Sequence, residues 1–164
     1  MPYQLAQLNI ATMKYSLDDP EMKGFVDNLD YINSLADNSP GFVWRLQDEE
    51  GDATSQRPLG ESTLVNLSVW KDVESLNQYV YKTAHVEIMK RRKEWFDRMK
   101  EAHYVLWWVP KNHHPDIHEA VAKLKLFQSS GPTPDAFNFR QAFASPDAAP
   151  LMNPFTLGDE CPAT

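Results

Sequence analysis

The residues of this chain best suited to acid–base or ligand chemistry are one histidine and one arginine. His85 falls at helical spacing with Ile88, Met89 and Arg92, and an imidazole on the inner face of a helix acts as a general base near neutral pH. Arg45 stands among bulky apolar residues, where its rigid fork of donors suits a carboxylate or a developing enolate. We predict both as catalytic candidates.

Each of these two residues also has a structural interpretation. His85 would be a hydrogen-bonded histidine between helix and sheet, because nothing near it in the sequence forms a triad or a ligand set. A buried Arg45 must be paired whatever the function, so an internal ion pair or a subunit contact is its alternative. Both alternatives stay open at the level of the sequence.

Further side chains are expected to wall a pocket for a small hydrophobic molecule. Tryptophan and tyrosine offer broad apolar surface with a polar handle, and a few polar groups among them fix the orientation of a ligand. The candidate substrate-binding residues are Asn66, Trp70, Tyr81, Met89, Trp95 and Trp107. Aromatic residues at these positions also suit a plain hydrophobic core, which is the alternative.

Composition and motif content argue against several classes of function. The net charge of −7 disfavours binding to a nucleic acid, whose affinity comes from clustered Lys and Arg. The glycines form neither a dinucleotide nor a nucleotide fingerprint. His113, His114 and His118 lack a cysteine or an inward carboxylate to complete a ligand set, so no metal is predicted. The single cysteine, Cys161, stands in a Pro-rich segment and is treated as incidental.

The hydropathy pattern predicts a soluble, cytoplasmic protein. The first five residues lack the basic region and apolar run of a secretory signal, and no later apolar run approaches the roughly 18 residues of a membrane span. We therefore expect no membrane partner.

The spacing of apolar residues predicts the elements that must position these side chains. Alternation predicts strands over 4–11, 42–47, 64–70 and 104–109, and helical spacing predicts helices over 20–38, 76–99 and 115–126. Lys82 and Thr83 mark a bend in the second helix. Residues 1–130 form the expected domain. The Pro-rich residues 131–164 contain phenylalanines, which predict an arm that packs and then a frayed end.

The resulting βαββαβ order is that of a ferredoxin-like α+β fold, in which helices cover one face of an antiparallel sheet. The other face then needs a partner. The strands offer one apolar set, Ala6, Leu8, Ile10, Val65, Leu67 and Val69, and one mixed polar set, Gln7, Asn9, Asn66, Ser68 and Trp70. The mixed set predicts a subunit interface or a cavity wall, because buried amides need hydrogen-bond partners.

Several blocks of the sequence together resemble a family of unknown function, DUF3291, of the dimeric α/β-barrel superfamily that includes the antibiotic-biosynthesis monooxygenases. The blocks are residues 39–47 (SPGFVWRLQ), 66–70 (NLSVW), 83–85 (TAH), 89–96 (MKRRKEWF) and 106–110 (LWWVP). Each block alone is a weak signal, and their combination is specific. The resemblance spans about residues 5–139 and implies the dimeric α/β-barrel fold.

The resemblance also implies a class of activity. Relatives in that superfamily hold a small hydrophobic molecule between sheet and helices; some oxidise aromatic polyketides without a cofactor, and others bind or degrade haem. We therefore expect a homodimer and a monooxygenase-like enzyme acting on a hydrophobic or aromatic substrate, with no cofactor predicted. A haem protein with His85 as axial ligand and a non-catalytic ligand-binding dimer are the alternatives.

Overall fold

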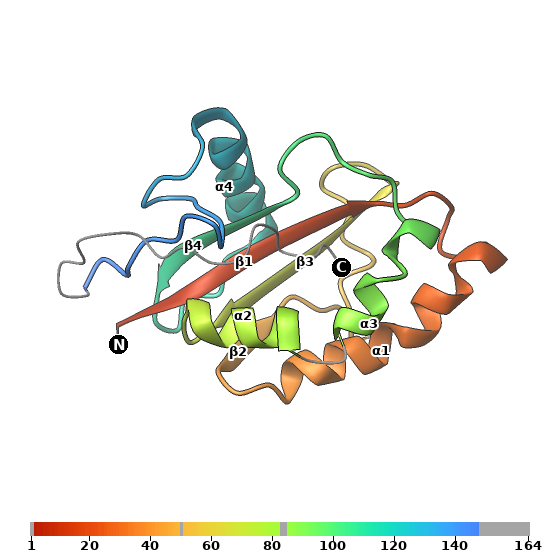
Figure 1. Cartoon of the computed structure of the whole chain (residues 1–164), viewed down its shortest axis with the longest axis horizontal. Coiled ribbons are helices and arrows are strands. Elements are labelled where there is room, and N and C mark those ends of the chain that lie inside the picture. Colours follow the sequence, from red (N-terminus) through yellow and green to blue (C-terminus); the bar gives the residue numbers. More distant parts are fainter. Residues whose placement is uncertain (1, 50, 83–84, 148–164) are drawn as a thin grey trace.

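In the computed structural model, the strands of the described part of the chain form one antiparallel sheet in the order β2-β3-β1-β4 (Figure 1). The structure describes residues 2–49, 51–82 and 85–147, and of residue 85 only the backbone. The strands are β1 (Tyr3–Thr12), β2 (Phe42–Arg45), β3 (Thr63–Trp70) and β4 (Tyr104–Pro110). Together with the helical crossovers, this order confirms the ferredoxin-like α+β fold.

The helices are α1 (Lys23–Asp37), α2 (Val73–Lys82), α3 (His85–Met89) and α4 (Ile117–Ser130), with short 3₁₀ turns η1 (Pro20–Met22) and η2 (Arg92–Glu94). Two of the helices, α2 and α4, begin beside an aspartate that caps their backbone. At the start of α4, the Asp116 carboxylate accepts from the backbone N–H of Glu119 at 2.8 Å, which satisfies one of the donors left free at a helix N-terminus. None of the helices in the described ranges is long and apolar enough to cross a bilayer.

The central strand β1 sends alternate side chains to opposite faces of the sheet. Its register against β3 places Gln7 opposite Ser68 and Leu8 opposite Leu67, so the mixed polar set and the apolar set lie on different faces. Helices α1, α2 and α3 lie on one side of the sheet and α4 on the other (Figure 1). The mixed set therefore lies beneath α1, α2 and α3.

Helix α4 covers the apolar face of the sheet, so the expectation that helices cover a single face is wrong. Ala120, Leu124 and Phe127 of α4 pack on the apolar strand residues, none of which is more than 6% exposed. A second sheet is thus not needed to bury this face. The homodimer stays a prediction from the resemblance, and its interface would have to use another surface.

The second predicted helix ends much earlier than residue 99. Helix α2 is described to Lys82 and α3 from His85 to Met89, and Thr83 of the predicted bend lies outside the described residues. After α3 and η2 the chain leaves helical geometry. Its backbone then pairs with the end of β1: Lys14 N–H donates to Trp95 C=O at 2.8 Å, and Asp97 N–H donates to Thr12 C=O at 2.9 Å. Trp95 and Phe96 are buried against α1, where Phe25 meets Phe96 edge to face. This packing overrides local helix propensity.

The arm after α4 packs on the sheet and pairs with its open edge. Phe137 and Leu106 exchange two backbone hydrogen bonds of 2.8 Å along β4, which covers an edge that would otherwise be free to pair with another chain. Phe137, Phe139 and Ala142 are fully buried. The predicted frayed end falls within residues 148–164, outside the described residues.

Replacing Leu124 by Ala should measure how much the packing of α4 contributes to the free energy of unfolding. Leu124 is 2% exposed and Leu126, on the same helix, is 37% exposed. We expect Leu124→Ala to lower the free energy of unfolding by about 2–5 kcal/mol in urea titrations, because the cavity is only partly refilled. Leu126→Ala should change it by less than about 0.5 kcal/mol. If both variants lost the same small amount of unfolding free energy, the packing of α4 on the sheet would be contradicted.

Candidate functional site

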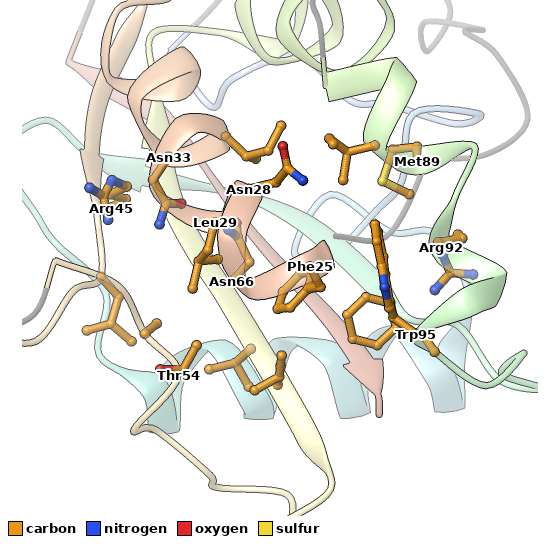
Figure 2. Close-up of a pocket in the computed structure, with 17 residues that line it drawn as sticks. Phe25, Asn28, Leu29, Asn33, Arg45, Thr54, Asn66, Met89, Arg92 and Trp95 are labelled. Atoms are coloured by element: carbon orange, nitrogen blue, oxygen red, sulfur yellow. The ribbon is translucent and has the colours of Figure 1, made fainter. Parts of the chain in front are cut away.

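A cavity lies between α1, the α3–η2 segment, the loop that follows β2 and strand β3 (Figure 2). Its apolar lining consists of Phe25, Leu29, Ile32, Leu46, Ala53, Leu64, Val65, Ile88, Met89, Trp95 and Phe96. Its polar lining consists of Asn28, Asn33, Arg45, Thr54, Asn66 and Arg92. Water-sized molecules have about 60 Å³ available in it, so the cavity is narrow.

The structure brings four of the predicted site residues to this cavity. Arg45, Asn66, Met89 and Trp95 all line it, although they come from β2, β3, α3 and the turn after η2. His85 is the first residue of α3, one helical turn before Ile88 and Met89; its side chain lies outside the described residues.

The other predicted substrate-binding residues lie in the core, away from the cavity lining. Trp70 stacks on Tyr79 of α2, with ring centroids 5.2 Å apart. Tyr81 meets Phe139 of the arm at 6.0 Å. Trp107 lies on the apolar face, where its indole N–H donates to Glu119 of α4 at 3.0 Å. These aromatic residues therefore occupy the core positions that the sequence left as the alternative.

A buried hydrogen-bond network fixes the amide of Asn66. Gln7 Nε2 donates to Asn66 Oδ1 at 2.6 Å and to Ser68 Oγ at 2.8 Å, and Trp70 Nε1 donates to the same Ser68 Oγ at 2.8 Å. Because Asn66 Oδ1 accepts from Gln7, the remaining donor of that amide is Nδ2. Asn66 thus offers the cavity a fixed N–H donor.

Asn33 brings a second amide to the cavity from α1. It is only 8% exposed, and within the described part of the chain its side chain makes no hydrogen bond. Figure 2 shows it between Arg45 and Asn66. Sequence reasoning missed Asn33; the available signal was an amide beside Ile32 on the otherwise apolar inner stripe of α1.

The Arg45 guanidinium makes three hydrogen bonds to structural partners. Its Nε and Nη2 donate to the two carboxylate oxygens of Asp37 at 2.7 and 3.2 Å, and its Nη1 donates to Gly51 C=O at 2.6 Å. The internal ion pair that the sequence left open is therefore the arrangement found. Arg45 ties the loop after β2, which supplies Ala53 and Thr54 to the lining, to the end of α1.

The wall opposite Arg45 is closed by stacking around Trp95. The Arg91 guanidinium lies 4.7 Å from the centre of the Trp95 ring and donates to Glu94 at 2.9 and 3.2 Å. These hydrogen bonds, with the attraction of the Arg91 charge, lower the pKa of the Glu94 carboxyl. A Cβ on Gly24 would come within 2.9 Å of Arg91 and 3.1 Å of Trp95, so a glycine there lets this wall approach α1.

The cavity does not fit a haem. Its volume of about 60 Å³ lies well below the roughly 300–1,000 Å³ typical of ligand pockets. The remaining histidines that drew attention in the sequence lie elsewhere: His113 Nε2 lies 2.7 Å from Glu119 Oε1, and His114 stacks on Trp44 at 4.7 Å. Among the described residues, no three His, Cys, Asp or Glu side chains gather as a metal site.

Comparison with known protein families gives one match over most of the chain. The model of the family described as "Domain of unknown function (DUF3291)" matches residues 4–152. A search among curated proteins found no match.

Solved structures with a similar arrangement come from several microorganisms. SnoaB of Streptomyces nogalater, described as a cofactor-independent oxygenase, is 14% identical with a TM-score of 0.44, over 69% of this chain and 98% of its own. A conserved protein of Methanosarcina mazei Go1 is 17% identical with a TM-score of 0.45, over 68% of this chain and 95% of its own. A dabb family protein of Mesorhizobium loti with a ferredoxin-like fold is 12% identical with a TM-score of 0.41, over 67% of this chain and 99% of its own.

Removing the shared acceptor Ser68 should destabilise the sheet beneath the cavity. Ser68→Ala leaves the Gln7 amide one acceptor short and the Trp70 indole N–H without an acceptor, both in a buried setting. Each such loss costs about 1–3 kcal/mol. We expect a lower free energy of unfolding in urea titrations, whereas Ser62→Ala, at an exposed position just before β3, should be neutral. A neutral Ser68→Ala variant would argue against the network.

Breaking the Arg45–Asp37 pair should loosen the loop after β2 more than the rest of the molecule. The Arg45 side chain is 11% exposed and that of Asp37 42%, so we expect Asp37→Asn to cost about 1 kcal/mol. Amide hydrogen exchange should accelerate in residues 51–56 and stay unchanged in β1. Lys23→Gln, which breaks an exposed pair on α1, is the control. If exchange in residues 51–56 accelerated no more in Asp37→Asn than in Lys23→Gln, the positioning role of Arg45 would be ruled out.

Proposed function

The chain belongs to the DUF3291 family, and from its cavity we propose that it binds a small, largely apolar molecule between helices and sheet and oxidises it as a monooxygenase-like enzyme. The observation that carries this proposal is the pair of amides, Asn33 and Asn66, that face a mostly apolar lining. A plain structural core favours apolar side chains or paired polar groups at such positions. Convergent polar groups in an apolar cavity are typical of a ligand site.

The size of the cavity sets a condition on the substrate. A cavity of roughly 150 Å³ holds benzene, and this one offers about 60 Å³. A molecule with one aromatic ring therefore binds only if the walls separate. Outside the sheet, the walls are α1, the loop after β2 and the α3–η2 segment. We assign the movement to the loop and to the α3–η2 segment.

The proposed reaction begins with an enolisable substrate. A base removes a proton from a carbon beside a carbonyl, and the Asn66 Nδ2–H donor stabilises the negative charge that develops on oxygen. The enolate carbon then reacts with O₂, and loss of water from the hydroperoxide leaves a new carbonyl, so that CH₂ and O₂ become C=O and H₂O. We assign the base to His85 because of its place on α3, one turn before two lining residues.

Oxygen uptake with two enolisable ketones of different size, anthrone and 2-tetralone, tests this proposal. We expect uptake that requires the protein and persists with a metal chelator present. His85→Ala should lower the rate about 100-fold or more, and Asn66→Ala about 100-fold through loss of an oxyanion donor. Circular dichroism should show that both variants remain folded.

His118→Ala is the matched control, because His118 is exposed on α4, on the opposite side of the sheet. Its rate should equal that of the parent protein. A protein that binds either ketone in the cavity but never consumes oxygen would favour the non-catalytic ligand-binding alternative. Equal rates of oxygen uptake in the His85 and His118 variants would contradict the assignment of His85 as the base.

A further inference from the structure

Asn33 is the one buried side chain of the cavity lining whose polar atoms the described part of the fold leaves without a hydrogen-bond partner. Asn33 is 8% exposed. An amide buried without hydrogen-bond partners costs free energy of folding. Its neighbour Asn28 differs: it also lines the cavity, but its Nδ2 donates to Gly24 C=O at 2.7 Å. The fold therefore pairs one α1 amide and leaves the other facing the cavity.

Asn33 and Asn66 together present a defined pattern of donors and acceptors. Asn33 offers one carbonyl acceptor and an NH₂ donor, and Asn66 adds the donor that Gln7 has fixed. Figure 2 shows both amides on the same side of the cavity, near Arg45. A carbonyl oxygen has two lone pairs and can accept from both donors, while an adjacent N–H or O–H can donate to Asn33 Oδ1.

We infer that Asn33 and Asn66 form an amide subsite for an uncharged group in which a carbonyl stands beside an N–H or O–H, as in a lactam, a carboxamide or a hydroxy-ketone. This inference rests on the proposed function, because it names the chemical class of ligand for the same cavity. It makes Asn33 a residue that determines specificity.

The charges around this end of the cavity favour a neutral ligand over a carboxylate. The Arg45 guanidinium beside Asn33 is neutralised by a bidentate pair with Asp37, and a further N–H, on Nη1, donates to Gly51 C=O. Arg92, the other cation of the lining, is carried by η2 next to Trp95. On α1, Asn33 lies about 12 Å beyond Phe25, and Phe25 contacts Trp95 with ring centroids 5.8 Å apart. The amide subsite is thus at the end of the cavity away from that cation.

Titration of the ¹⁵N-labelled protein with three small probes tests the subsite by NMR. 2-Pyridone carries the carbonyl and N–H, N-methyl-2-pyridone lacks only the N–H donor, and toluene lacks both polar groups. We expect 2-pyridone to bind about tenfold more tightly than its N-methyl derivative, the difference of one good hydrogen bond. Asn33→Leu should abolish that difference and retain toluene, and Asn28→Leu should leave the difference in place.

Thermal unfolding of the same variants separates a ligand site from a structural role. Because Asn33→Leu removes an unpaired buried amide, we expect the melting temperature to rise by about 2–4 °C. A fall in the melting temperature would mean that Asn33 supports the fold and would overturn the inference. Asn28→Leu, which breaks a formed hydrogen bond, should lower it.

The outcomes of the titration distinguish this inference from the proposed function. If toluene binds while the two pyridones bind equally, the amide subsite is wrong and the ligand cavity stands. Benzoate, titrated as a fourth probe, tests the charge preference: tighter binding than that of 2-pyridone would overturn the preference for an uncharged group. If no probe shifts the amide signals of cavity residues, both the subsite and the proposed function fail.

Discussion

The register of β1 against β3 decides what each face of the sheet is made of, and the two halves of the molecule follow from it. In the observed register, Gln7 lies opposite Ser68 and Leu8 opposite Leu67, so amides face α1 and α3 while aliphatic residues face α4. Since side chains alternate with a period of two, a slip of one residue would exchange the two faces of β1. The amides of β1 would then lie beneath α4, and its apolar residues would lie beneath the helices of the other face.

The amides of Asn66 and Asn33 both line the cavity, but within the described part of the chain only that of Asn66 is hydrogen-bonded. Gln7, Ser68 and Trp70 satisfy one another and hold Asn66 in one orientation, so their burial costs little and gives rigidity. Asn33 has no such partners within the described residues. Polar groups that the fold leaves unpaired beside a cavity depart from local consistency, and such departures are expected at functional sites.

Much of the fold followed from the sequence because it rests on local patterns. Period-two alternation located the strands that form the sheet. The prediction of one helix through residue 99 was wrong, because the backbone of Trp95 pairs with β1 and does not continue a helix. Helical spacing describes which side chains share a face, but it carries no information about a strand end that offers better hydrogen bonds.

The sequence by itself therefore determined the strands, the two faces of the sheet and four residues that meet at the cavity. Only the tertiary structure decided that Arg45 pairs with Asp37, that α4 covers the apolar face, and that Asn33 lacks a partner within the described residues. The physical reason is that hydrogen-bond pairing and burial depend on segments distant in the chain, whereas strand and helix periodicity is set by neighbours a few residues away. The role of a polar residue is fixed by what packs around it.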